Sequence, residues 1–147
     1  TYIITTKRRK KKEINFNNIR IKFIKTKPKY FFGYTKERYG SINIFMAEKE
    51  KALIDSALFK KISFSEICEI IKNNIKDIDT NLFIKYLIKI NNKALIKRFG
   101  FLFDKLNIKM PHKIEELIDF KYIPFDYAIK SKGKRNKKWK VIENVRL

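Results

Sequence analysis

The spacing of apolar residues changes along the chain, and this change indicates the fold class. In the first third, Ile19, Ile21 and Phe23 alternate with basic residues, which is the two-residue period of a half-buried strand. From Ala47 onward apolar residues recur with a helical period, and the tail returns to β character. We therefore expect an α+β fold, in which a small, mainly antiparallel or mixed β-sheet from the N-terminal third and the C-terminal tail packs against about four to five α-helices.

Four stretches of the first third are candidate strands: residues 2–6, 19–23, 30–34 and 42–46. The pairs and triplets Asn17-Asn18, Lys27-Pro28 and Tyr39-Gly40-Ser41 supply turns between them. In the tail, residues 123–129 and 139–145 have the composition of two strands around a basic loop at 131–134. We expect these two strands to form a hairpin that rejoins the sheet.

Four amphipathic helices are expected between these strand regions. The first covers roughly residues 48–60, and the second opens with Ser63 and Glu66 at the spacing of a capping box. Asp79 or Thr80 caps the third, and the fourth follows Asn91-Asn92. The expected inward faces are Leu53, Ile54, Ala57 and Leu58; Ile67, Cys68, Ile71 and Ile75; Leu82, Phe83, Tyr86, Leu87 and Ile90; and Leu95, Ile96, Phe99, Leu102, Phe103 and Leu106.

The chain carries a net charge of +21, from 36 Lys and Arg against 15 Asp and Glu. AT-rich codons would enrich Glu together with Lys, so codon bias does not account for the shortage of acids. Such an excess of positive charge repels itself, and a polyanion relieves the repulsion as counterions are released. Nucleic acid, and DNA in particular, is the partner we favour; the alternatives are a solvated basic surface with no bound polyanion, or an acidic membrane or protein surface.

Two segments concentrate the cations, and each is expected to form a loop between strands. If the first and last strands are neighbours, the two loops form one patch that holds phosphates with little reading of bases. Alternatively, both loops are solvated and blunt aggregation at a sheet edge. Trp139 either stacks on an unpaired base or anchors the core, which is the commoner role of a strand Trp. The candidate nucleic-acid-binding residues are Lys7, Arg8, Arg9, Lys10, Lys11 and Lys12, and Lys132, Lys134, Arg135, Lys137, Lys138 and Trp139.

Three of the fifteen carboxylates lie within eight residues, from Glu48 to Asp55. Glu48 and Glu50 fall in the first turn of the first expected helix, where the helix dipole favours negative charge. Lys51 and Asp55 are four residues apart on one helical face, so we expect them to pair. Because Glu48 and Glu50 point to different sides of a helix, a catalytic pair of carboxylates is not expected.

The same region carries a resemblance to a known family. Residues 47–55, AEKEKALID, resemble the signature A-x-x-E-K-(A/T)-L-L-D of the AbiEi antitoxins of type IV, or abortive-infection, toxin–antitoxin systems. Residues 97–103, KRFGFLF, are similar to that family's later element R-L-G-(Y/F)-L-L, with Phe99 and Phe103 in place of its usual leucines. The order and spacing of these blocks agree with the family over nearly the whole chain. The signature residues are Glu50, Lys51, Asp55, Arg98 and Gly100.

We prefer structural roles to catalytic ones for these signature residues. A Gly inside a helix costs about 1 kcal/mol relative to Ala, and Gly100 is expected where another backbone approaches closely. Arg98 is expected to pair with Asp55 or with carbonyl groups at a helix C-terminus; the alternative is a contact with phosphate.

The resemblance also implies a function. Members of the family carry an N-terminal winged-helix domain that binds promoter DNA, followed by a domain of the kind seen here that is linked to antitoxic activity. We expect residues 1–147 to form a single AbiEi-like C-terminal domain without the winged helix. Either the winged helix was lost from a longer protein, which the absence of an initial Met favours, or the chain is a lone domain of the C-terminal type. The implied role is a non-catalytic antitoxin and transcriptional regulator, whose functional partner is a nucleotidyltransferase-like toxin opposed without a stable complex. The alternative is a general nucleic-acid-binding module unrelated to a toxin.

Enzyme activity, metals and cofactors are not expected. A nuclease would need clustered metal-binding carboxylates near a Lys, and Asp119-Phe-Lys121 is the only Asp-x-Lys of the sequence. Cys68 lies on an apolar helical face and is expected in the core, and His112 has no Cys or His companion and is expected at a helix start or on the surface. No apolar run approaches the roughly 18–20 residues of a membrane span and no signal peptide is recognised, so a cytoplasmic protein is expected.

Overall fold

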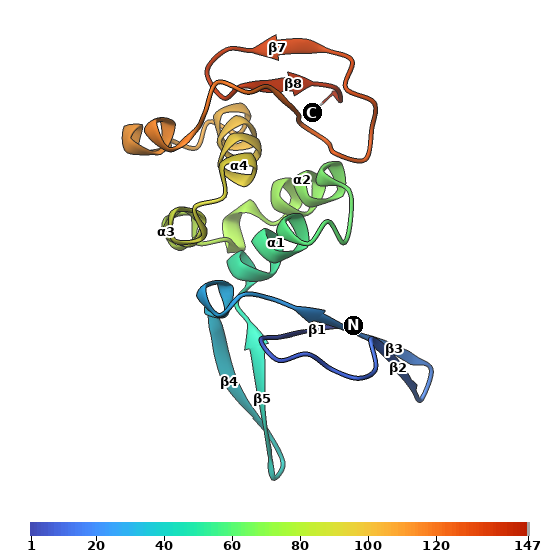
Figure 1. The fold of residues 1–147 in the computed structure, drawn as a ribbon. Coiled ribbons are helices and arrows are strands. Elements are labelled where there is room, and N and C mark those ends of the chain that lie inside the picture. The colour runs from blue at the N-terminus through green and yellow to red at the C-terminus, as the bar shows by residue number, and fades with distance from the viewer. Residues whose placement is uncertain (147) are drawn as a thin grey trace. The chain divides into compact units, whose positions relative to one another are not determined.

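The computed structural model describes residues 1–146, apart from the side chain of Phe16. The chain divides into two compact units, unit 1 at residues 1–33 and unit 2 from Tyr34 onward (Figure 1). The expected α+β class is confirmed, since helices and strands both contribute to the fold. The strands form three small sheets rather than one.

Unit 1 is built on a mixed three-stranded sheet. β1 (Tyr2–Thr5) pairs in parallel with the central strand β3 (Ile19–Lys25), and β2 (Glu13–Phe16) pairs antiparallel with β3. Asn17 and Asn18 join β2 to β3 with φ angles of 45° and 62°, the left-handed conformations of a tight hairpin turn. The strands expected at residues 2–6 and 19–23 are confirmed. β2 was not expected, because its two apolar residues adjoin the long basic run.

The strand expected at residues 30–34 is wrong, because this stretch begins at the end of a 3-10 helix, η1 (Pro28–Tyr30). Pro28 starts the helical turn with its fixed φ, and Gly33 has a φ of 70° that interrupts extended backbone. A strand begins only at the next residue: β4 (Tyr34–Tyr39) pairs with β5 (Ile42–Ala47) in an antiparallel hairpin. The expected turn at Gly40 is confirmed, and every residue of both strands is exposed.

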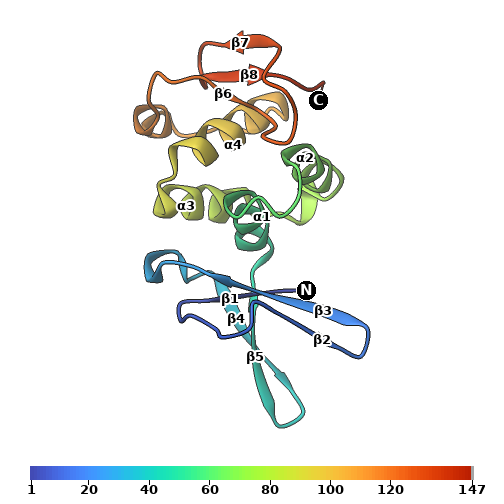
Figure 2. The same ribbon diagram turned by 45° about the vertical axis from the view of Figure 1, so that its right-hand side comes forward.

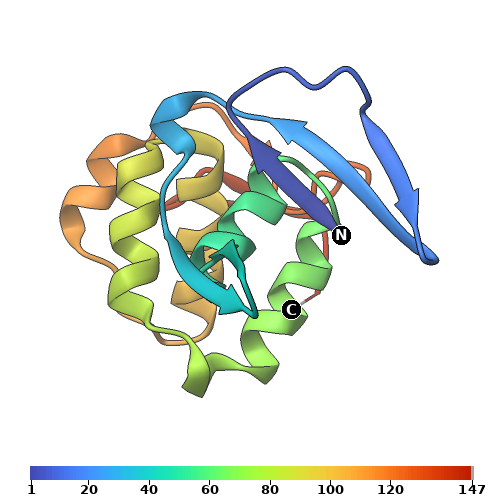
Figure 3. The same cartoon turned by 90° about the horizontal axis from the view of Figure 1, so that it is seen from below.

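The four expected α-helices of unit 2 are confirmed, and they pack on one another (Figure 3). The capping box of Ser63 and Glu66 is present, and Asp79 and Asn92 each accept the backbone N–H three residues further on. These caps mark three of the four helix starts. The helices are α1 (Lys49–Leu58), α2 (Phe64–Asn73), α3 (Thr80–Ile90) and α4 (Lys93–Lys105), with two 3-10 helices, η2 (Ile75–Asp77) and η3 (His112–Leu117).

The central element of unit 2 is α4, which is buried on all sides. All nine residues from 95 to 103 are buried, whereas the sequence predicted a single inward face. Aromatic rings surround the helix: Phe64 of α2 and Phe83 of α3 lie 5.0 Å and 4.9 Å from the ring of Phe99, and Phe125 lies 4.9 Å from Phe101. A helix covered on all sides is the core of its domain.

The C-terminal sheet has the order β6-β8-β7 and lies beside α4 (Figure 2). β6 (Ile123–Pro124) runs parallel to β8 (Val141–Glu143), and β7 (Lys134–Asn136) runs antiparallel to β8. The hairpin expected from residues 123–129 and 139–145 is therefore wrong. The two segments pair in parallel, which requires a long connection, and the antiparallel partner of β8 comes from inside the basic segment.

Candidate nucleic-acid interface

The net charge per residue is higher in unit 1 than in unit 2. Its 33 residues hold eleven Lys and Arg and one acid, Glu13, which accounts for +10 of the total +21. Unit 2 holds the other 25 Lys and Arg and 14 acids, a net charge of +11 over 114 residues. Unit 1 therefore carries about three times the net charge per residue, and the local potential that attracts polyanions is correspondingly larger there.

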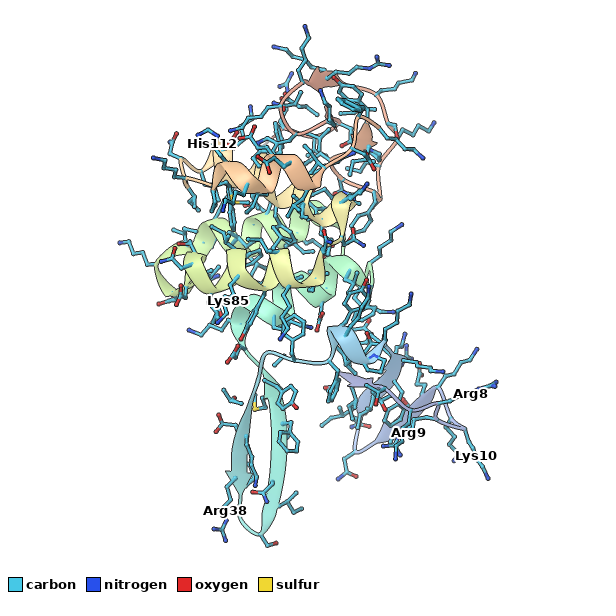
Figure 4. The ribbon with its side chains drawn as sticks, turned by 60° about the vertical axis from the view of Figure 1, so that its left-hand side comes forward. Arg8, Arg9, Lys10, Arg38, Lys85 and His112 are labelled. Carbon is cyan, nitrogen blue, oxygen red and sulfur yellow. The ribbon has the colours of Figure 1, made fainter. Side chains whose placement is uncertain are left out.

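Six cations of unit 1 follow one another in the loop between β1 and β2, residues 7–12. The loop is attached at both ends. The Lys7 N–H donates to the Thr5 hydroxyl over 3.2 Å, and the Lys12 carbonyl accepts the N–H of Phe23 over 2.9 Å. The side chains of Arg8 and Lys10 extend away from the loop (Figure 4). A backbone fixed at both ends thus presents long, exposed cationic side chains.

A hollow of about 420 Å³ lies between this loop and β3. The guanidinium of Arg9 lies over the half-buried ring of Phe23, 5.8 Å from its centroid. Guanidinium and ammonium groups around an open hollow suit phosphate, which they hold by charge-assisted hydrogen bonds. The lining comprises six cations, Lys7, Arg8, Arg9, Lys11, Lys12 and Lys25, together with Thr5 and Phe23.

Glu13, the one acid of unit 1, does not neutralise this loop. Its carboxylate lies 3.3 Å from Nε of Arg20 and 3.7 Å from Nζ of Lys22, both on β3. Within residues 1–146, no carboxylate forms an ion pair with a cation of residues 7–12. The charge of the loop is therefore balanced only by solvent ions, which phosphates would displace.

In the second basic segment, residues 130–140, some of the candidate nucleic-acid-binding side chains are exposed and others are engaged within the fold. Trp139 is fully buried and its indole N–H donates to Oδ2 of Asp104 over 2.7 Å, so it anchors the core and its ring is not open to a base. Lys138 lies 2.9 Å from the same oxygen and 3.6 Å from Glu115, and its hydrogen bond to Asp104 raises the pKa of Lys138. The other candidates of this segment are exposed: Lys132, Lys134, Arg135 and Lys137.

The two basic segments are not joined by a common sheet, so the condition for one joint patch, neighbouring first and last strands, is not met. β8 is the central strand of its own sheet, with β6 on one side and β7 on the other. Because β8 has a neighbouring strand on each side, β1 cannot pair with it. Each basic segment presents its charge on its own unit.

The acidic cluster at the start of α1 connects two helices. Glu48 is the N-cap residue of α1 and accepts a hydrogen bond from the hydroxyl of Tyr86 on α3, which raises the pKa of Tyr86 to about 12. Glu50 is 5% exposed and accepts the backbone N–H of Asp79 over 2.8 Å. The positive end of the α1 dipole favours both carboxylates. Their hydrogen bonds to Tyr86 and Asp79 also hold α3 against α1.

The expected pair of Lys51 and Asp55 is present, but it is buried. Nζ of Lys51 lies 2.6 Å from Oδ1 of Asp55, and the two side chains are 3% and 8% exposed. Burial raises the pKa of Asp55, against the opposite effects of the hydrogen bond and the charge of Lys51. A buried pair of this kind adds little net stability, but removing one partner is destabilising because the other charge stays buried.

Arg98 and Gly100 contact the C-terminal segment. Nε of Arg98 donates to the carbonyl oxygens of Phe125 over 2.9 Å and Pro124 over 3.2 Å, and its guanidinium lies 5.3 Å from the ring centroid of Tyr127. The expected partners, Asp55 and carbonyls at a helix end, are therefore wrong, and the buried Arg98 is not open to phosphate. A Cβ on Gly100 would lie 2.3 Å from the ring of Trp139. The close approach predicted at Gly100 is thus made by an aromatic ring rather than by backbone.

Asp126 is an important residue that the sequence did not indicate. It is fully buried, and it accepts hydrogen bonds from the N–H and hydroxyl of Ser65 over 2.9 Å and 2.5 Å and from the N–H of Ala128 over 2.8 Å. Burial acts to raise the pKa of Asp126, but these hydrogen bonds outweigh it and the pKa is lowered. Asp126 thus attaches the segment after β6 to the start of α2, and no local signal marks it because Ser65 lies 61 positions away.

Asp119, Cys68 and His112 were considered from the sequence as chemically reactive or metal-binding residues. Asp119, from the single Asp-x-Lys, lies 2.5 Å from Nζ of Lys97 and 3.6 Å from Nζ of Lys93. Cys68 is buried as expected, which raises its pKa to about 12, and His112 is the exposed first residue of η3.

Within residues 1–146, no group of three or more His, Cys, Asp and Glu side chains is arranged to hold a metal ion. None of the helices in the described part of the chain has the length and apolarity to cross a membrane.

A scan against protein-family models, a search of curated proteins and a search of solved structures each found no match to this chain.

Proposed function

We propose that the chain is a non-catalytic regulator that binds nucleic acid, DNA foremost, through the basic loop of unit 1 and the exposed cations of residues 130–137. The observation that carries the proposal is the loop at residues 7–12: five of its six cations line a hollow together with Lys25, and within residues 1–146 none of the six forms an ion pair with a carboxylate. Its biological role is that of an antitoxin, which the resemblance to the AbiEi family implies.

A polyanion explains this surface better than solvent alone. Six adjacent cations on a loop fixed at both ends repel one another, and phosphates relieve that repulsion while counterions are released. Lys and Arg side chains on a loop contact phosphates without reading bases, so we expect affinity with little sequence preference. Such binding weakens with salt by about 0.9 log units per phosphate contact and per log unit of salt.

A charge-matched pair of variants tests the proposal. The first variant changes four loop cations, Lys7, Arg8, Lys10 and Lys11, to Gln. The control changes four exposed lysines of unit 2 to Gln, which lowers the net charge equally: Lys76, Lys85, Lys109 and Lys113. Lys85 lies on the outer side of α3 (Figure 4).

Fluorescence anisotropy with a labelled DNA duplex, at salt concentrations from about 50 to 200 mM, measures binding and its salt dependence. We expect the loop variant to lose affinity by more than about tenfold and to have a shallower salt slope, with a much smaller change in the control. Equal losses in the two variants would mean a diffuse polycation, and no binding by the unmodified chain would reject the nucleic-acid proposal.

The antitoxin role needs a separate test, because binding alone also fits a general nucleic-acid-binding module. Co-expression of the full-length protein with a nucleotidyltransferase-like toxin encoded by a neighbouring gene should restore growth. Failure of that rescue, or the absence of such a gene, would favour the general binding module. The partner is a functional one, so the proposal does not require the two proteins to co-purify.

A further inference from the structure

A cluster of two aromatic rings and two cations lies on the C-terminal sheet of unit 2. Phe120 is 90% exposed. Nζ of Lys140 lies 5.9 Å from its ring centroid and 5.8 Å from that of Tyr122, and the guanidinium of Arg135 lies 5.2 Å from the centroid of Tyr122. A single exposed apolar residue needs no explanation; this one is unusual because a cation lies over its ring and a second cation lies over the ring of Tyr122 nearby.

The backbone brings this cluster together from three segments. Phe120 and Tyr122 precede β6, Arg135 belongs to β7, and Lys140 lies between β7 and β8 (Figure 2). The Lys140 carbonyl accepts the N–H of Ile123 over 3.1 Å, which ties the turn to the start of β6. Lys140 has a φ of 55°, a left-handed conformation that Lys rarely adopts.

The cluster is locally positive. Asp119, the adjacent acid, lies 2.5 Å from the buried Nζ of Lys97, whose hydrogen bond lowers the pKa of Asp119. Glu143 on β8 lies 3.7 Å from Lys105. In the part of the chain that the structure describes, no carboxylate forms an ion pair with Lys121, Arg135 or Lys140. The exposed ring of Phe120 therefore has one unneutralised cation against it, Lys140, and a second, Arg135, lies over the neighbouring ring of Tyr122.

We infer that Phe120 is the stacking platform for an unpaired base of single-stranded nucleic acid, with Lys140 and Arg135 on the flanking phosphates. This inference rests on the proposed nucleic-acid binding and adds a preference for unpaired strands. An exposed ring stacks on any base, whereas the bases of a duplex are already stacked and paired. Trp139, the other aromatic considered for this role, is fully buried.

The test compares three labelled ligands of equal length, about 12 nucleotides per strand: a single strand, the same strand with abasic sites, and the duplex. All three contact the loop cations through phosphates, but only the first offers unpaired bases. For the full chain, we expect the single strand to bind about tenfold more tightly than the abasic strand. Phe120→Ala and Phe120→Leu should remove this difference and leave duplex binding unchanged, whereas Phe120→Trp should retain it.

Ile129→Ala is the control, because Ile129 is an exposed apolar residue of the same unit, 47% exposed. It should leave all three affinities unchanged. Thermal unfolding should be the same for the Phe120 variants and the unmodified chain, since a side chain that is 90% exposed contributes little packing.

The inference is overturned if Phe120→Ala binds the intact single strand as tightly as the unmodified chain, or if it weakens single-strand and duplex binding equally. In either case the chain still binds nucleic acid and the proposed function stands. If the unmodified chain binds none of the three ligands at low salt, the proposed function itself fails.

Discussion

Gly100→Ala is expected to destabilise unit 2, although the same change stabilises most helices. Ala is favoured over Gly by about 1 kcal/mol inside a helix. A Cβ on Gly100, however, would lie 2.3 Å from both Cε3 and Cζ3 of Trp139. The ring of Trp139 is fully buried and its indole N–H is bonded to Asp104 over 2.7 Å. Its burial and its hydrogen bond both oppose a displacement of the ring.

The size of the effect follows from these two opposing contributions. Overpacking a core costs about 1–3 kcal/mol, and the upper end applies because the ring must move by about 1 Å to reach ordinary contact. With the helix-propensity gain of about 1 kcal/mol, the net destabilisation is about 2 kcal/mol. For a domain of this size that corresponds to a fall in Tm of roughly 8 °C.

Urea unfolding followed by circular dichroism and by fluorescence measures this effect, and Trp139 is the only Trp of the chain. The near-UV signal of Trp139 should also change, because its ring is displaced. In a Trp139→Leu background the clash is absent, so Gly100→Ala should be neutral or stabilising by up to about 1 kcal/mol. A more stable Gly100→Ala single variant, or the same effect in both backgrounds, would refute this reasoning.

Two further predictions concern buried charges. Asp55→Asn should lower the free energy of unfolding by about 3–5 kcal/mol, because it leaves the charge of Lys51 buried. The double variant Asp55→Leu with Lys51→Met should recover most of that loss. Urea unfolding measures both variants, and an equal loss of stability in the two would contradict the role of a buried pair. The folded protein holds the pKa of Asp126 below its ordinary value. The contribution of Asp126 to the free energy of unfolding is therefore complete above the unfolded pKa of about 4, and it is lost as the pH falls through the lower folded pKa. Stability measured at several pH values should therefore fall more steeply below about pH 4 in the unmodified chain than in Asp126→Asn, and parallel curves would rule out this role for Asp126.

The helices of unit 2 could be predicted from the sequence because their signals are local. The capping interactions of Ser63, Asp79 and Asn92 each join residues three positions apart, and the apolar faces repeat within one or two turns. The turn at Gly40 and the pairing of Lys51 with Asp55 are local in the same sense. The excess of positive charge in residues 7–12 is likewise a property of the sequence alone.

Tertiary structure decided burial and strand pairing. α4 has an amphipathic pattern, yet residues 95–103 are all buried because aromatic residues from α2, α3 and the C-terminal segment cover it. The basic segment supplied β7, Trp139 is buried in the core, and Phe120, which no sequence signal marked, is 90% exposed.

The physical reason is distance along the chain. A cap or a helical face is defined by neighbours within about four residues, whereas the contact of Gly100 with Trp139, the bonds of Asp126 to Ser65 and the parallel pairing of β6 with β8 join distant residues. The sequence by itself therefore determined the helices, their caps and the strongly basic loops. Only the tertiary structure decided which cations are neutralised, which aromatic ring is exposed, and hence which surfaces are available to bind a polyanion.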